Sequence, residues 1–377
     1  MEILPIRKNH FITLSYIFFA ASILLLICSS WAKVSDFPAK NMIGLAEELS
    51  ECFWLGLLFI LLSMFFLVFD PCCHRHEKMF VAEVLLFAIY LYAIPALVEE
   101  NVYYPDTWGH SAGVVSILIN GNYDKTGIWY VMQYPGAFIL LSVAVLVSGL
   151  DPITFVKYYP IMFSGYIVLV SYLLFRKLFP NKKMSYFATI FFVSGSVWAL
   201  PKHFCPNGPA LILYLLIFNL ALSKKALEKT LLIILLTASI IVTHPTTIPF
   251  LIVSATLIPV ASILLYKRIE NISLNNGWSL SKFFPIFVII LWFTWSIFNA
   301  TGVLTYITKT VARFFGSLSE FISLERTAER LHTTSPLIIG QTLKMSYTIL
   351  YTLMSFIGAL CLTFDVFKKK KRENAHL

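Results

Sequence analysis

An aspartate and a histidine spaced four residues apart are the strongest candidates for chemistry in this chain. Asp106 and His110 lie in the stretch 103–113, which opens an apolar run that stops at Asn120. The pattern predicts a short helix of about fourteen residues, on which residues four apart share one face. A carboxylate and an imidazole on one face can accept a proton from a hydroxyl group or hold a metal ion.

The same residues have structural interpretations that stay open at this stage. An aspartate that follows Pro105 and precedes an apolar helix is a common N-cap, and a single His110 also fits an interfacial hydrogen-bonding role. Glu99 and Glu100 are supporting acids in the catalytic interpretation. In the structural one they mark the polar end of an apolar segment.

Basic residues and histidines in later segments complete the candidate set. Lys202 and His203 lie in a loop with three prolines, and His244 stands between two apolar runs. Arg326 and Arg330 belong to an amphipathic stretch with helical spacing. We interpret all five as ligands for an anionic phosphate group. The alternatives are a backbone-bonded His244 and arginines that bind lipid headgroups.

Composition places the chain in a membrane. Of its 377 residues, 58% are hydrophobic and 13% charged, and the mean hydropathy is +0.78. Soluble globular domains do not have this balance, so we predict an all-α polytopic membrane protein. The net charge of +9 comes from short loops and the basic tail 368–372, which the positive-inside rule explains without nucleic acid.

The apolar segments predict where the helices lie. They are 11–31, 52–70, 79–98, 135–149, 158–176, 185–200, 209–223, 229–243, 245–266, 283–299 and 343–365. If the short segment 135–149 does not cross the bilayer, most of the 29 Lys and Arg residues fall on the cytoplasmic side. We therefore expect about ten transmembrane helices in a multi-pass protein of the cell membrane, with both termini cytoplasmic and juxtamembrane helices in the external loops.

The topology divides the chain into five parts. These are three N-terminal spans (1–98), an external acidic loop with a juxtamembrane helix and a short non-spanning segment (99–157), a transmembrane helix bundle (158–299), an external amphipathic segment (300–342), and a last span with a basic cytoplasmic tail (343–377).

Cysteines and acids do not indicate a metal site. The run Cys72-Cys73-His74-Arg75-His76 lacks a second ligand pair at zinc-site spacing, and the six cysteines do not form a secreted disulfide framework. Neither Glu99 nor Glu100 has a spacing to Asp106 that requires joint ligation. We predict no metal ligands and no certain cofactor, and a divalent metal held by Asp106 stays open as an alternative.

Several motifs together resemble a known family. Asp106 and His110 are followed by the turn Gly121-Asn122-Tyr123, and Tyr134-Pro135-Gly136 enters an apolar segment that ends Ser148-Gly149-Leu150-Asp151. This order resembles the first external loop of the GT-C glycosyltransferases, which include protein mannosyltransferases, aminoarabinose transferases and oligosaccharyltransferases. The resemblance covers roughly residues 80–260. Family members commonly place the acidic loop after the first span, whereas here two further spans come before it.

The resemblance implies a function. GT-C enzymes transfer sugars from polyprenyl-phosphate donors and use an acidic residue of this loop, often Asp, as the catalytic residue, which by position matches Asp106. The expected partners are a polyprenyl-phosphate sugar, membrane lipids and an acceptor that the sequence does not identify. Two other classes stay open: a transporter or flippase of lipid-linked glycans, and a glycan polymerase or ligase that uses a diphosphate donor.

Overall fold

The computed structural model of the chain describes most of the membrane-embedded region. The described residues are 10–32, 44–123, 133–179, 181–195, 203–223, 226–266 and 280–302, together with 305, 309, 342, 346–358 and 360–361. All regular secondary structure in these ranges is helical, which confirms the predicted all-α class.

The helices follow the apolar segments of the sequence. Their bounds are α1 His10–Trp31, α2 Glu51–Phe69, α3 Glu77–Tyr92, α4 Ile94–Val98, α5 Pro105–Asn120, α7 Gly136–Ser148, α8 Pro152–Leu178, α9 Lys182–Gly195, α10 Asn207–Ala221, α11 Leu227–Thr243, α12 Thr247–Tyr266 and α13 Phe284–Phe298. Two short 3₁₀ helices, Gly44–Glu47 and Cys73–Arg75, precede α2 and α3.

Length and composition give several of these helices membrane character. In the described ranges α1, α2 and α8 are long and apolar enough to cross a bilayer. Helices α7, α10 and α13 are shorter apolar helices, as is the part of α12 from Thr247 to Ile258. Large apolar side chains face outward from the bundle, as Leu24 and Phe298 do at 68% and 77% exposure. An outer surface of this kind suits hydrocarbon better than water.

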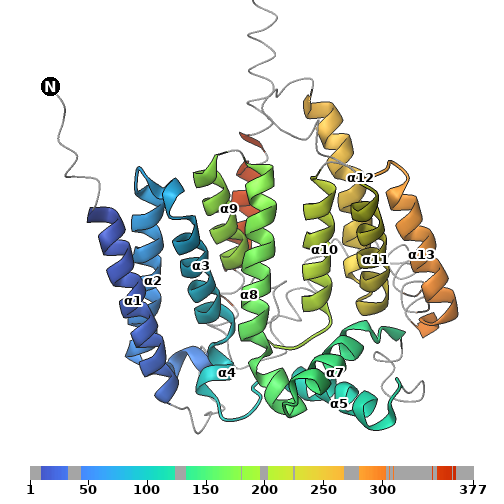
Figure 1. Ribbon diagram of the computed structural model, residues 1–377, viewed down its shortest axis with the longest axis horizontal. Coiled ribbons are helices and arrows are strands. Elements are labelled where there is room, and N and C mark those ends of the chain that lie inside the picture. Colours follow the sequence, from blue (N-terminus) through green and yellow to red (C-terminus); the bar gives the residue numbers. More distant parts are fainter. Residues whose placement is uncertain are drawn as a thin grey trace, which may run out of the picture.

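Most helices run side by side, and a smaller group lies across one end of them. Figure 1 shows α1, α2, α3, α8, α9 and α10 as neighbouring upright helices, with α11, α12 and α13 beyond α10. At the lower end in that view, α4 is followed by α5 and α7, which lie obliquely beneath α8, α11 and α13. This end of the bundle carries the candidate acids.

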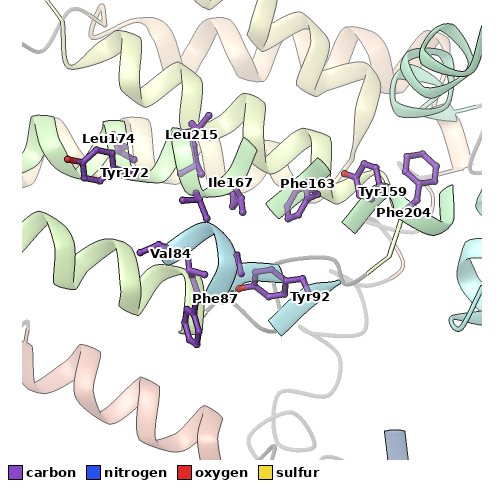
Figure 2. Packing of buried hydrophobic residues seen from close by; sticks show 14 of the residues in the cluster. Val84, Phe87, Tyr92, Tyr159, Phe163, Ile167, Tyr172, Leu174, Phe204 and Leu215 are labelled. Carbon is purple, nitrogen blue, oxygen red and sulfur yellow. Dashed lines mark hydrogen bonds between the residues drawn. The ribbon is translucent and has the colours of Figure 1, made fainter. Parts of the chain in front are cut away.

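Helix α8 forms the centre of the packing. Phe163 and Ile167 of α8 are buried, as are Phe87 of α3 and Leu215 of α10 on its neighbours (Figure 2). The start of α8 is set locally. Asp151 caps it by accepting a hydrogen bond from the Thr154 backbone N–H at 3.0 Å, and Pro152 occupies the first turn, where a missing N–H costs nothing.

The predicted segment 79–98 is divided into two helices. Helix α3 ends at Tyr92 and α4 begins at Ile94, with Pro95 in its first turn. A proline inside a continuous helix would remove a backbone hydrogen bond and collide with the preceding turn. At the end of α3 the Tyr92 hydroxyl donates to the carbonyl of Val193 in α9, and α4 then leads into the acidic stretch.

A buried acid connects the first three helices. Glu83 of α3 is fully buried, and its Oε1 atom accepts hydrogen bonds from the hydroxyl groups of Ser15 in α1 and Ser63 in α2. Nearer the other end of α1, the Ser22 hydroxyl donates to the Gly56 carbonyl and the Tyr90 hydroxyl donates to the Ser22 carbonyl. These bonds give Glu83 a structural role in holding α1 against α2 and α3.

Candidate active site

The local sequence of α5 fixes the position of Asp106. Tyr104 occupies the N-cap and makes no side-chain capping bond, Pro105 takes the first turn, and Gly121 ends the helix with a φ of 67°. Asp106 is therefore in the first turn and exposed, so its N-cap interpretation is wrong. A carboxylate at this place is stabilised by the positive end of the helix dipole.

His110 follows one turn later and is tied to a distant loop. Its Nδ1 atom lies 3.2 Å from the carbonyl oxygen of Phe204. A carbonyl can only accept, so Nδ1 carries the proton of a neutral ring and Nε2 is its acceptor nitrogen. The ring centroid lies 5.8 Å from that of Phe138 and 6.2 Å from that of Phe204. Burial lowers the pKa of His110, while the Phe204 carbonyl and Asp106 oppose this shift.

His203 completes a cluster with Asp106 and His110. Its ring lies over that of Tyr104, with centroids 4.7 Å apart and planes 30° apart. Burial and the charge of His110 lower the pKa of His203, and the Asp106 carboxylate opposes them. The structure thus brings three of the sequence-predicted residues, from segments almost a hundred positions apart, within electrostatic range of each other.

His244 approaches the same cluster from the end of α11. Its Nδ1 atom lies 2.9 Å from the Thr247 hydroxyl oxygen and 3.2 Å from that of Thr246. Burial, with a smaller contribution from the charge of His110, lowers the pKa of His244 to about 4. Near neutral pH these half-buried imidazoles are uncharged. His203 and His244 can each offer an N–H donor to an anion, whereas the single proton of His110 is already donated to the Phe204 carbonyl.

Close backbone packing brings α7 against the end of α11. Gly136 begins α7, and a Cβ atom at this position would lie 2.6 Å from the Thr243 hydroxyl oxygen and 2.9 Å from the Val242 carbonyl oxygen. Only glycine permits that approach without displacement of the neighbours. The Tyr134-Pro135-Gly136 motif therefore has a structural function beside His244.

Glu99 and Glu100 belong to a second group with a basic residue that the sequence reasoning missed. The Lys157 ammonium donates to the Glu100 carbonyl oxygen at 2.8 Å, and its charge opposes the burial that raises the pKa of Glu99. Among the described residues the Glu99 Oε1 atom is buried without a hydrogen-bond partner. The signal in the sequence for Lys157 was its position: a lysine near the start of the apolar helix that begins at Pro152.

A small cavity separates the two groups. Tyr103, Thr107, Lys157 and His203 contribute to its lining, and its volume of about 20 Å³ suits a single water molecule. The Thr107 hydroxyl is buried there and has no hydrogen-bond partner in the part of the chain that the structure describes. Lys157 and His203 therefore line the same cavity.

An apolar groove begins beside His110. It lies between α7, α8 and α10 and has a volume of about 280 Å³. Its lining includes Leu141, Ala144, Tyr159, Phe163, Phe204 and Leu213. Phe204 and Tyr159, which are neighbours in Figure 2 with ring centroids 5.2 Å apart, link this groove to the cluster, because Phe204 also contacts His110.

The remaining sequence-predicted residues are Lys202, Arg326 and Arg330, which lie outside the described residues. Within the described ranges, no group of three or more His, Cys, Asp or Glu side chains is arranged to hold a metal ion. Asp106 with His110 can serve as a proton acceptor, His203 and His244 as hydrogen-bond donors, and Lys157 as a local positive charge.

Comparisons of the chain with protein-family models, curated proteins and solved structures found no match.

Proposed function

We propose that this chain is a membrane glycosyltransferase that moves a sugar from a polyprenyl-phosphate donor to an acceptor hydroxyl on the external face. One observation carries the proposal: an exposed carboxylate and a half-buried imidazole share one helix, and the imidazole contacts Phe204, which lines an apolar groove. A donor with a hydrocarbon tail and a polar head needs this combination. The resemblance of the acidic stretch to GT-C enzymes, which includes the same Asp106 and His110, also favours it.

The proposed orientation places α4, α5 and α7 at the external membrane surface. About ten helices cross the membrane, α7 does not, and both termini are cytoplasmic, in agreement with the distribution of basic residues. In this orientation Asp106, His110, His203 and His244 gather at one surface.

In the proposed reaction the prenyl tail occupies the apolar groove and the phosphate lies near the histidines. Asp106 accepts the proton of the acceptor hydroxyl as its oxygen attacks the anomeric carbon. The bond between that carbon and the phosphate oxygen breaks, and polyprenyl phosphate leaves. Direct displacement inverts the anomeric centre. Imidazole N–H groups and Lys157 stabilise the departing phosphate, with Lys202, Arg326 and Arg330 as further candidates.

A transporter of lipid-linked glycans is the second candidate, because the apolar groove would also suit its lipid tail. Such a protein needs polar groups along a path through the bilayer. In the described helices the polar cluster gathers at one end, and the buried Glu83 is bonded to two serines. This distribution favours chemistry at one surface over passage across it.

The decisive experiment measures sugar transfer from labelled polyprenyl-phosphate donors in proteoliposomes. Asp106→Asn should lose turnover by about 100-fold or more while it still binds donor, as expected for removal of a general base. Asp151→Asn, at the cap of α8, is the matched control and should retain turnover. Glu99→Gln with Glu100→Gln tests the supporting acids, and transfer with and without a chelator tests metal dependence.

Two results would count against the proposal. If the unmodified protein neither binds nor turns over any donor across several sugars, the glycosyltransferase proposal is rejected. The transporter proposal is then tested by measuring donor flux. If Asp106→Asn and Asp151→Asn behave alike, the carboxylate of Asp106 is not the catalytic group.

A further inference from the structure

Two cysteines meet where α1 ends and α2 begins. Cys28 lies one turn before the end of α1, Cys52 is the second residue of α2, and their Sγ atoms are 3.1 Å apart. Both are free thiols, and Cys28 is exposed while Cys52 is half-buried. The two thiols therefore lie at the surface of the bundle near the end of the candidate span α1, with their sulfur atoms in contact.

The helices hold the two thiols in register. Buried Ser22 of α1 donates to the Gly56 carbonyl of α2 at 2.9 Å, one to two turns from the cysteines. An S–S bond is about 2 Å long, so closure requires a movement of about 1 Å, which side-chain rotation can supply.

We infer that Cys28 and Cys52 form a redox site that closes to a disulfide. A thiolate of the pair attacks the disulfide of an oxidant and forms a mixed disulfide, which the second thiolate then resolves. The pair loses two protons and two electrons, and the oxidant, a small-molecule or protein disulfide, is released as two thiols. The product links α1 covalently to α2.

A metal ion fits the pair less well. Structural zinc sites use four ligands, and the described residues contain no group of three or more His, Cys, Asp or Glu side chains able to share an ion. In the proposed orientation both thiols are on the external side, where disulfides persist. The inference does not depend on sugar transfer, so its test and the donor assay fail independently.

The test counts thiols in the full chain, purified in detergent and equilibrated with reduced and oxidised glutathione at a series of ratios. Acid-quenched samples are unfolded and alkylated with a polymer-linked maleimide, which retards each labelled chain on a gel. Oxidising ratios should give four labelled thiols out of the six cysteines, and full reduction should give six. Peptide mass spectrometry should then recover a peptide that links Cys28 to Cys52.

Matched variants assign the bond. Cys28→Ser and Cys52→Ser should each show five labelled thiols on full reduction and no peptide that links these two positions at any ratio. At oxidising ratios the remaining thiol of the pair can only be blocked as a mixed disulfide, which mass spectrometry shows as one added glutathione. Cys361→Ser removes an exposed cysteine elsewhere. This variant should show three labelled thiols at oxidising ratios and five on full reduction. Six labelled thiols in the unmodified chain at every ratio, a bond to another cysteine, a bond between two chains, or protection that a chelator rather than a reductant removes would each overturn the inference.

Discussion

The Nδ1 atom of His110 lies 3.2 Å from the carbonyl oxygen of Phe204, a residue 94 positions further along the chain. This bond fixes the proton of the neutral imidazole on Nδ1 and ties α5 to the segment that enters α10. Phe204 also lines the apolar groove, so one hydrogen bond connects the proposed acid–base pair to the proposed donor tail site.

The proposed reaction should depend on a neutral His110, because only the neutral ring keeps Nε2 as an acceptor nitrogen. Burial lowers the pKa of His110 below its usual value of 6.5, so the ring stays neutral as the pH falls through 6.5. We expect kcat/KM for sugar transfer to hold at pH 6.5 and to decline only below it. His110→Asn should lower kcat/KM about 10- to 100-fold and should also remove the decline of kcat/KM below pH 6.5. His76→Asn, on the loop before α3, is the control, and an unchanged profile in His110→Asn would contradict the role.

His244 should make stability depend on pH. Its pKa is lowered to about 4, against about 6.5 in an unfolded chain, so the unfolded state binds more protons between these values. The contribution of His244 to the free energy of unfolding is complete above pH 6.5 and is lost as the pH falls toward 4. It amounts to about 3 kcal/mol at most. Thermal unfolding in detergent should show a shallower loss on acidification for His244→Gln than for the unmodified chain. If the unfolding temperatures of His244→Gln and the unmodified chain fall equally with pH, His244 makes no such contribution.

The close approach of α7 to α11 predicts opposite effects of one substitution at two glycines. Gly136→Ala places a methyl group against Thr243 and Val242 and should destabilise the protein by about 1–3 kcal/mol. Gly165→Ala, in α8, meets nothing within 4 Å and should be neutral or stabilising by up to about 1 kcal/mol. Chemical or thermal unfolding measures both. Equal effects would show that α7 is not held against α11.

Filling the apolar groove should discriminate between long and short donors. Ala144 lines the groove, so Ala144→Phe should raise KM for a long polyprenyl donor by about 10-fold and affect a short-chain donor less. Val147, on the same helix and 83% exposed, provides the control Val147→Phe, for which no change is expected. Equal KM changes for both donors in Ala144→Phe would place the tail elsewhere.

Much of the fold is local and therefore legible in the sequence. Apolar run length sets the helices. Asp151 and Pro152 set the start of α8, and Gly121 and Gly149 set the ends of α5 and α7 through positive φ angles of 67° and 69°. The i, i+4 spacing of Asp106 and His110 likewise follows from helix geometry. The errors at this level were also local: Pro95 divides one expected segment, and Pro105 moves the N-cap from Asp106 to Tyr104.

The tertiary structure decided the chemistry of the site. Burial makes the histidines neutral, and burial depends on neighbours such as Phe204 and Tyr104 that no local pattern connects to them. Packing also assigned Glu99 to Lys157 rather than to Asp106, and opened the groove between three helices distant in sequence. Desolvation and long-range contacts exist only once the helices are assembled, whereas propensity, capping and hydrophobic length act within a few residues.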